Sequence, residues 1–403
     1  MLRQPVGRQW PAFPTIVPNL RDCDHPADRL SGRMARFVKS RCRARHVLPP
    51  GRHSRLVSSQ LLTVAHDDDT VPAMQIAGGQ FVITGGASLI GSHVADTLLA
   101  QGARQVVLLD NFSLGTPQTV SHLVGDERVK LVRGDILRIN ELFDAFAGAD
   151  GVFAIAGFLT LPLTQNPPLG LAVNVDGQVN VFEACRYRGV KKVVFSSSVA
   201  AYGEPGPGVT DENSPANLAP FQPGAMLYSC TKLIGEALCR HYHARHGVQA
   251  LALRYSTVYG ERQHYRGVNA LYIVENYDRI MRGERPTIPG DGSEVHDYIH
   301  VSDVARANVM AMTSDVSGET LNIVSGVAST VKRVVELLLE ITASTLAPIY
   351  GSHAGSVQSS TGSALNFSRA KAERLLGWQP EIDLAEGLRR LIAWRSQEPT
   401  AQG

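Results

Sequence analysis

Tyr228 and Lys232 stand four residues apart in the run Tyr-Ser-Cys-Thr-Lys. On a helix, this spacing places the phenol and the ammonium group one turn apart on the same face. A nearby cation favours the phenolate, so we expect Lys232 to lower the pKa of Tyr228 from about 10 toward the range of a general base. Such a pair could take the proton of a hydroxyl group. The spacing also occurs by chance on exposed helices, so other motifs are needed to assign chemistry.

Composition limits the class of protein. The chain has 403 residues, 44% of them hydrophobic, which is enough for one large domain or two interleaved ones. Residues 1–60 hold 12 of the 39 basic and three of the 37 acidic residues, leaving 27 basic and 34 acidic side chains after them. A mildly acidic body gives no reason to expect a nucleic-acid partner. The five cysteines lack CxxC and metal-ligand spacing, which predicts a reducing, cytoplasmic location and no metal site. No apolar run reaches the roughly 18 residues that span a bilayer, so no membrane partner is expected.

Residues 1–74 differ from the rest, because they are rich in Arg, contain scattered Pro and show no helical or strand periodicity. Three interpretations remain open: a disordered extension, an organelle transit segment, or a stretch added by a start codon assigned too far upstream. The third is favoured because Met74 opens a run that leads directly into a strand at Phe81. Mass spectrometry of the native N-terminus tests it, and a peptide recovered from residues 1–60 would exclude it.

From Phe81 onward, short apolar runs alternate with helical patterns, which is typical of strands buried on both faces of a parallel sheet. The fold class is therefore a doubly wound α/β sheet, the Rossmann fold. Loops rich in Pro and Gly after residue 203 predict a smaller second domain. We expect a dinucleotide-binding domain over 75–260 and a mainly substrate-binding domain over 261–400, partly interleaved with the sheet. The expected strands are 81–84, 106–109, 129–132, 151–155, 193–195 and 250–253.

A glycine-rich run, Thr84 to Gly91, directly follows the first strand and opens the first helix. Gly85 allows the tight turn, Gly91 allows close packing of helix on strand, and the free amides at the helix N-terminus attract a pyrophosphate. Ser88 stands where a middle glycine would let the backbone approach the phosphates. We therefore expect NAD to bind here. Ser88 is expected to weaken cofactor binding or to shift the position of the pyrophosphate.

Asp110 lies nineteen residues beyond Gly91, at the end of the second strand. A carboxylate there accepts hydrogen bonds from the ribose 2′-hydroxyl and repels a 2′-phosphate, which selects NAD over NADP. The alternative is an ordinary turn aspartate. Asp135 and Ile136 follow the third strand, where an adenine ring would pack.

Taken together, these motifs resemble the NAD-dependent epimerase/dehydratase family, the extended short-chain dehydrogenase/reductases, over about residues 76–395. The resemblance rests on an ordered series of short motifs. They are Thr84 to Gly91, Asp110, Gly134-Asp135-Ile136, Ala156-Gly157, Asn174 to Gly177, Phe195 to Ser198, Tyr202-Gly203, Tyr228 to Lys232, Leu253 to Tyr255, Val258 to Gly260, Gly290 to Ser293 and Leu375 to Trp378.

The resemblance assigns roles to individual residues. Tyr228 is implied as the catalytic acid/base, with Lys232 lowering its pKa and holding the nicotinamide ribose. Ser198 is implied to bridge the substrate hydroxyl and the Tyr228 oxygen, and it follows a strand at the carboxyl edge, where such sheets bind ligands. Asn174 either supports the cofactor or caps a helix. The full expected cofactor set is Gly85, Gly86, Leu89, Ile90, Gly91, Asp110, Asn111, Asp135, Ile136, Ile155, Ala156, Asn174 and Lys232.

The implied reaction is hydride chemistry at a carbinol carbon of a sugar nucleotide. Tyr228 takes the hydroxyl proton while NAD takes the hydride, leaving a ketone. If the hydride returns to the other face of that ketone, the enzyme is an epimerase of the 4-epimerase type. If the ketone leaves, it is a dehydrogenase of a sugar or another secondary alcohol. A non-catalytic NAD-binding regulator is the third possibility, and the resemblance also implies a homodimer through two helices per subunit.

Several positions depart from the family pattern. The 4,6-dehydratases carry an Asp-Glu pair directly after the catalytic hydroxyl residue, and here Val199 and Ala200 can transfer no proton. Thr257 replaces an Asn near the substrate diphosphate, His296 replaces an Arg, and residues 351–365 lack an expected Arg. Thr and neutral His match phosphate oxygens poorly, so the substrate is unusual or another arginine substitutes. The candidates, each of which could equally be a surface charge, are Arg262, Arg266, Arg282 and Arg285.

Two further groups of side chains have simple interpretations. His241, His243 and His246 follow Lys232 on the same predicted helix, without a carboxylate at metal-ligand spacing. They are expected to be exposed and not to bind metal. Cys230 is expected to be a small helix residue without a redox role.

Overall fold

The computed structural model describes residues 74–263, 270–351 and 365–397. Three parts of the sequence discussed above lie outside these ranges: the N-terminal segment 1–73, Arg266, and residues 352–364 of the segment expected to contain an arginine. The expectations made for them are therefore not tested. Within the described ranges, no helix is long and apolar enough to cross a membrane.

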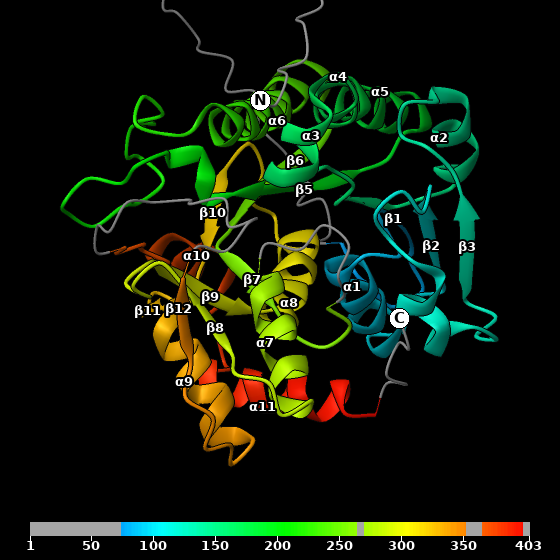
Figure 1. Ribbon diagram of the computed structural model, residues 1–403. Coiled ribbons are helices and arrows are strands. Elements are labelled where there is room, and N and C mark those ends of the chain that lie inside the picture. The colour runs from blue at the N-terminus through cyan, green and yellow to red at the C-terminus, as the bar shows by residue number, and fades with distance from the viewer. Residues whose placement is uncertain (1–73, 264–269, 352–364, 398–403) are drawn as a thin grey trace, which may run out of the picture. The chain divides into compact units, whose positions relative to one another are not determined.

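The main sheet has seven strands in the order β10-β6-β5-β4-β1-β2-β3, and every neighbouring pair is parallel (Figure 1). This order confirms the predicted doubly wound fold, and the six expected strands all form. The sequence did not predict β10, whose Thr-Leu-Asn-Ile pattern is short and half polar. The strands are β1 (Gln80–Thr84), β2 (Gln105–Asp110), β3 (Val129–Arg133), β4 (Gly151–Ala154), β5 (Lys192–Ser198), β6 (Gln249–Tyr255) and β10 (Thr320–Ile323).

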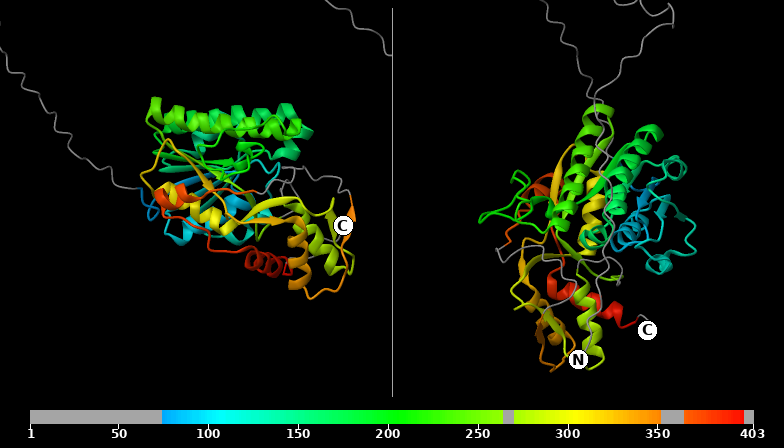
Figure 2. Two further views of the ribbon diagram at one scale, coloured as in Figure 1. Left: turned by 90° about the vertical axis from the view of Figure 1, so that its left-hand side faces the viewer. Right: turned by 45° about the horizontal axis from the view of Figure 1, so that its top comes forward.

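Successive strand side chains point to opposite sides of the sheet, and both sides are buried over six of the strands, whereas the edge strand β3 is largely exposed. Phe81 and Ile83 of β1 enter one hydrophobic cluster, and Val82 enters the other. Figure 2 shows the long helix α6 lying along one face of the sheet. The first face is covered by α1 (Leu89–Ala100), α8 (Val301–Thr313) and α10 (Ala370–Leu376), and the second by α2 (Ile139–Ala145), α3 (Thr160–Gln165), α5 (Gly177–Arg188) and α6 (Pro223–His246).

Several short helical segments join these elements near the carboxyl ends of the strands. They are the 3-10 helices η1 (Pro117–Leu123) and η3 (Val199–Tyr202), α4 (Pro167–Leu171), and the π-helical turn η2 (Ala172–Asp176). The π turn sits directly before α5 and carries Asn174. Such turns are frequent at functional sites.

The remaining C-terminal elements pack around a third hydrophobic cluster. Two small sheets have the strand orders β11-β9-β7 and β12-β8. Since α8 and β10 return to the main sheet, this part of the chain is interleaved with it, while the division at residue 260 stays a prediction. The elements are β7 (Thr257–Tyr259), α7 (Leu271–Met281), β8 (Thr287–Pro289), β9 (Val295–His300), β11 (Ala328–Thr330), α9 (Val331–Ile341), β12 (Ile349–Gly351) and α11 (Leu384–Arg395).

A buried charge cluster connects α1 to the segment that follows β7. His93 Nδ1 lies 2.9 Å from the Leu89 carbonyl, and its Nε2 lies 3.9 Å from Glu261 Oε2. The same Glu261 oxygen lies 3.1 Å from His300 Nε2. Arg262 pairs with Asp96 on α1. Burial, reinforced by the Arg262 charge, lowers the pKa of His93 to about 4.

This depressed pKa predicts acid sensitivity. The folded state keeps His93 neutral, whereas the unfolded chain takes up the proton as pH falls below its pKa of 6.5. His93 should therefore lower the free energy of unfolding by about 2 kcal/mol between about pH 7 and about pH 5. Urea unfolding at both pH values measures this, and His93→Gln should remove most of the loss. His241→Gln, at an exposed histidine, is the control; an unchanged pH dependence in His93→Gln would contradict the assignment.

Candidate active site

The glycine-rich turn between β1 and α1 is packed too closely for side chains. Gly85 has a φ of +70°, and a Cβ added there would lie 2.9 Å from the Ala156 nitrogen. A Cβ at Gly91 would lie 2.4 Å from the Gly85 carbonyl oxygen and 2.9 Å from the Gly86 Cα. Only glycine fits these two positions, and the tight turn they form leads directly into the N-terminus of α1.

Ser88 caps α1. Its hydroxyl donates to the Gly85 carbonyl at 2.6 Å and accepts the Gly91 N–H at 3.2 Å. The backbone at Ser88 is extended, with φ −98° and ψ 172°, so the position has no conformational need for glycine. The preference of serine for helix N-caps was the signal that could have identified this role from the sequence.

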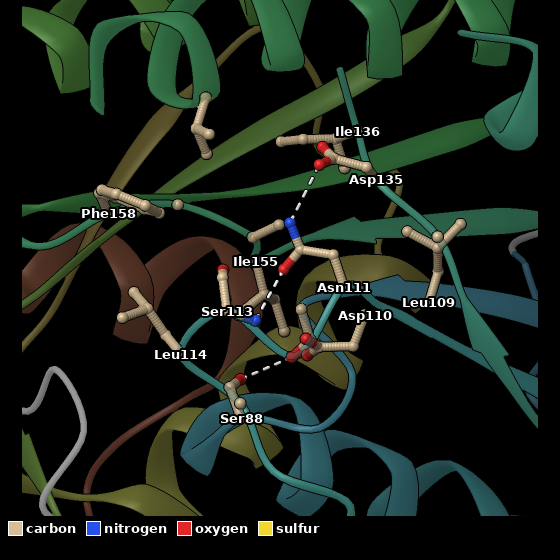
Figure 3. A pocket seen from close by; sticks show the side chains of 16 residues that line it. Ser88, Leu109, Asp110, Asn111, Ser113, Leu114, Asp135, Ile136, Ile155 and Phe158 are labelled. Carbon is tan, nitrogen blue, oxygen red and sulfur yellow. Dashed lines mark hydrogen bonds between the residues drawn. The ribbon is translucent and has the colours of Figure 1, made fainter. Parts of the chain in front are cut away.

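A pocket lies at the carboxyl ends of β1, β2, β3 and β4 (Figure 3). Seven residues of the expected cofactor set line it: Gly85, Asp110, Asn111, Asp135, Ile136, Ile155 and Ala156. Six others do not line it: Gly86, Leu89, Ile90, Gly91, Asn174 and Lys232. The lining residues absent from that set are Ser88, Leu109, Ser113, Leu114, Gly115, Gly134, Gly157, Phe158 and Val173.

Asp110 is held at the floor of this pocket. Its Oδ2 accepts the Ala87 N–H at 3.0 Å and its Oδ1 accepts the Phe112 N–H at 2.8 Å. Burial raises the pKa of Asp110, and these two N–H groups partly oppose that shift. Asn111 donates to Asp135 Oδ2 at 3.1 Å, as Figure 3 shows. The carboxylate is thus both a structural acceptor for the glycine turn and a lining group that could meet a ribose.

Ser198, Tyr228 and Lys232 lie together, as the sequence predicted. Ser198 ends β5, while Tyr228 and Lys232 share one face of α6. The Ser198 hydroxyl lies beside the Tyr228 phenol, where it acts to lower the tyrosine pKa. Lys232 Nζ donates to the Ser196 carbonyl at 2.9 Å and lies 5.5 Å from the centre of the Tyr228 ring. All three groups are therefore positioned by a strand end and one helix.

Gly157 connects this trio to the pocket. Gly157 lines the pocket, and a Cβ added to it would lie 3.3 Å from Asn174 Oδ1 and 3.7 Å from Lys232 Nζ. Asn174 Oδ1 accepts the Phe158 N–H at 2.7 Å, and its Nδ2 donates to the Phe158 carbonyl and to Thr231 Oγ1. Asn174 is therefore no helix cap: it fixes the 157–158 loop against α6.

The expected direction of the Tyr228 pKa shift is wrong for the protein by itself. Burial raises the pKa of Tyr228 to about 12, and the neighbouring Ser198 hydroxyl only partly opposes this rise. Burial also lowers the pKa of Lys232 to about 8, against the opposing charge of Glu236. The reason is that removal from water disfavours both charged forms, while the ammonium is directed at a carbonyl and not at the phenol oxygen.

Two of the departures from the family pattern are neighbours. Thr257 Oγ1 lies 3.5 Å from His296 Nδ1 across the β7–β9 pair, and His296 Nε2 lies 2.8 Å from Glu294. Three of the four candidate arginines have other partners. Arg262 pairs with Asp96, Arg282 pairs with Glu284, and Arg285 donates to the carbonyls of Ala347 and Pro348.

The histidines at the end of α6, namely His241, His243 and His246, are exposed, as expected. Over the described parts of the chain, no group of three His, Cys, Asp or Glu side chains could hold a metal ion. Cys230 is an exposed free thiol, while the described thiols Cys185 and Cys239 are buried.

The fold and site define a dinucleotide-binding protein with a serine–tyrosine–lysine group beside its pocket. Residues 81–324 match the model of the NAD dependent epimerase/dehydratase family. The chain is 33% identical to a putative UDP-glucose 4-epimerase of Methanocaldococcus jannaschii, over 78% of this chain and 97% of that protein. It is 28% identical to UDP-glucuronic acid decarboxylase 1 of Danio rerio, over 79% of this chain and 73% of that protein.

Among solved structures, the chain resembles a UDP-glucose 4-epimerase of Thermotoga maritima crystallised with UDP-glucose. The TM-score is 0.70 with 29% identity, covering 79% of this chain and 99% of that one. The chain belongs to the NAD-dependent epimerase/dehydratase family, whose members act on sugar nucleotides. This confirms the family, the fold and the NAD cofactor expected from the sequence.

Proposed function

We propose that this protein is an NAD-dependent epimerase of a sugar nucleotide, of the UDP-glucose 4-epimerase type. The observation that carries the proposal is the placement of Ser198 beside the buried Tyr228. Lys232 lies one turn further along the same helix, and Gly157 links this group to the pocket. The relatives named above include 4-epimerases, which supports the inversion of a carbinol carbon as the reaction.

The residues fit a bound dinucleotide. Gly85 and Gly91 let the turn pack closely on its own backbone and on Ala156, and this turn leads into the start of α1, where N–H groups attract a pyrophosphate. Asp110 would meet the adenine ribose, and Asp135 and Ile136 line the pocket where adenine would lie. When bound, NAD supplies a reversible acceptor for a hydride from the substrate carbon.

The protein's own residues handle the proton. In the proposed site, Ser198 orients the substrate hydroxyl toward the Tyr228 oxygen, which accepts its proton and later returns it. Because burial raises the pKa of Tyr228 to about 12, its phenolate needs neighbouring positive charge. Lys232, 5.5 Å from the ring centre, supplies one such charge when protonated.

The residues after Ser198 favour epimerisation over elimination. Val199 and Ala200 begin the 3-10 helix Val199–Tyr202 directly beyond the catalytic serine. Neither side chain can donate or accept a proton, so these two positions offer no acid or base to remove water from the ketone. A decarboxylase or dehydrogenase outcome would use the same serine, tyrosine and lysine, and product analysis separates these alternatives.

The direct test has two parts. Purified protein is denatured and assayed for released NAD, and native protein is incubated with UDP-glucose or UDP-galactose. The proposal predicts retained NAD and conversion of each UDP-hexose into the other without net NADH. Accumulating NADH with an oxidised product would favour the dehydrogenase, and identical activity of wild type and Tyr228→Phe would favour the non-catalytic NAD-binding regulator.

Replacing Asp110 tests cofactor selection. Asp110→Ala removes the carboxylate proposed to meet the 2′-hydroxyl, so NAD affinity should fall about 10- to 100-fold, the value of one or two charge-assisted hydrogen bonds. Preference for NAD over NADP should fall in parallel. Titration calorimetry with both nucleotides measures this. Asp126→Ala, at a carboxylate paired with Arg128, is the control; equal NAD affinity in wild type and Asp110→Ala would contradict the role.

A homodimer remains part of the proposal. Large apolar side chains are exposed on the helices of one side of the main sheet, where Figure 1 shows α3, α4 and α6 together. They are Leu161, Leu169, Leu171, Leu227 and Ile234. Ile234→Glu should therefore convert a dimer into a monomer in sedimentation velocity, whereas Val327→Glu, at an exposed valine beyond β10, should not. A wild-type monomer would overturn the dimer.

A further inference from the structure

A buried ion pair lies directly behind the catalytic groups. Glu236 on α6 accepts two hydrogen bonds from Arg254 on β6, from Nε and from Nη2, each 2.7 Å long. The Ser197 hydroxyl of β5 donates to the same carboxylate at 2.6 Å. The side chains of Arg254 and Glu236 are 7% and 3% exposed. One carboxylate therefore joins α6, β5 and β6 inside the core.

The place of this carboxylate relates it to all three catalytic residues. Glu236 is one turn beyond Lys232 on α6. Ser197 lies between Ser196, whose carbonyl accepts Lys232 Nζ, and Ser198, which contacts Tyr228. A shift of Glu236 would move the strand end that holds the serine and the helix that holds the tyrosine and lysine.

We propose that Glu236, held by Arg254, is a positioning residue of the acid/base site. Its carboxylate fixes the end of β5 against α6 and keeps the Lys232 side chain charged. This inference rests on the proposed function, because the groups it positions are those assigned to proton transfer.

The electrostatic surroundings of Lys232 explain why a carboxylate is needed. The titratable groups facing Lys232 are Tyr228 and Glu236 on its own helix and Arg254 behind them, while β5 contributes the Ser196 carbonyl. Burial lowers the pKa of Lys232 to about 8, and Glu236 opposes that shift. Without the carboxylate, the Lys232 pKa would fall further, and less of the amine would carry the charge that favours the Tyr228 phenolate.

The arginine is itself held in place. The Arg254 guanidinium carbon lies 4.3 Å from the centre of the Tyr202 ring, and the Tyr202 hydroxyl donates to Asn322 at 2.7 Å. A buried ion pair commonly stabilises a fold no better than apolar side chains of the same volume. A charge kept at this place is therefore better explained by its effect on Lys232.

The test measures the titration of Lys232 directly. Full-length protein with 13C-labelled lysine gives signals from only seven lysines, and Lys232→Arg identifies the one of interest. In Glu236→Gln, the Lys232 midpoint should fall by about one pH unit. Lys192, whose pKa burial also lowers to about 8, is the internal reference and should not move. Glu183→Gln, at a carboxylate paired with Arg186, is the matched control.

The result that overturns the proposal is a Lys232 midpoint unchanged in Glu236→Gln, whatever happens to activity. Glu236→Gln leaves Arg254 unpaired and could fail to fold. In that case Glu236→Gln/Arg254→Met removes both charges, and again a lower Lys232 midpoint supports the proposal while an unchanged one overturns it. In kinetics, Glu236→Gln should lower kcat more than it changes KM and move the alkaline limb of the pH profile to lower pH. If no nucleotide sugar is turned over, the proposed function fails while the lysine titration still tests the positioning role.

Discussion

Tyr228→Phe should lower kcat about 100- to 10,000-fold, the usual contribution of a general acid/base. The change removes only the phenol oxygen, which contacts Ser198. NAD content and thermal stability should stay close to those of the wild type, because the ring still fills its buried place on α6. Steady-state kinetics with a UDP-hexose, together with NAD release on denaturation, measure both quantities.

Tyr242→Phe is the matched control for this prediction. Tyr242 is a buried tyrosine on the same helix, and its hydroxyl donates to Glu183 on α5. Its removal should leave kcat within a few-fold of the wild type. Equal kcat in wild type and Tyr228→Phe would contradict the acid/base assignment. A loss of kcat in Tyr242→Phe as large as that in Tyr228→Phe would mean that the substitutions disturb the helix and do not report on the Tyr228 phenol.

Gly91→Ala should lose most of its bound NAD. The new Cβ would lie 2.4 Å from the Gly85 carbonyl oxygen and 2.9 Å from the Gly86 Cα. Both are backbone atoms of the turn that must hold the pyrophosphate. Overpacking of about 1–3 kcal/mol corresponds to a fall in NAD affinity of about 10- to 100-fold. Titration calorimetry measures the NAD affinity, and thermal unfolding measures how much the substitution destabilises the fold.

Gly208→Ala is the corresponding control, because an added Cβ there meets nothing within 4 Å. It should bind NAD as the wild type does. NAD affinity of Gly91→Ala equal to that of the wild type would show that the turn between β1 and α1 is not the phosphate cradle.

The strands and the glycine turn were predictable because their signals are local. Apolar runs such as 81–84 and 106–109 carry the strand pattern in a few consecutive residues, and a glycine run between strand and helix has one common use. β10 escaped prediction because its four residues include Thr320 and Asn322, which tertiary contacts bury. Ser88 departs from the glycine pattern and instead caps α1, a role that its capping preference also predicts.

The placement of the candidate site residues was predictable from the sequence, whereas their electrostatics were not. The motif around Tyr228 and Lys232 predicted their shared helix face, and the strand before Ser198 predicted its place at the sheet edge. The direction of the tyrosine pKa shift depends on burial and on where the ammonium points, and neither is encoded in the spacing. The network of Ser197, Glu236 and Arg254 joins residues up to 57 positions apart, so no local pattern reveals it.

The most direct test of the proposed epimerase follows one hydrogen atom. UDP-glucose carrying deuterium at C4 is incubated with the protein in ordinary water, and the product is examined by NMR and mass spectrometry. The proposed epimerase should form UDP-galactose that keeps its deuterium at C4, without added NAD and without net NADH. Loss of the label to solvent, or an oxidised product with accumulating NADH, would contradict it.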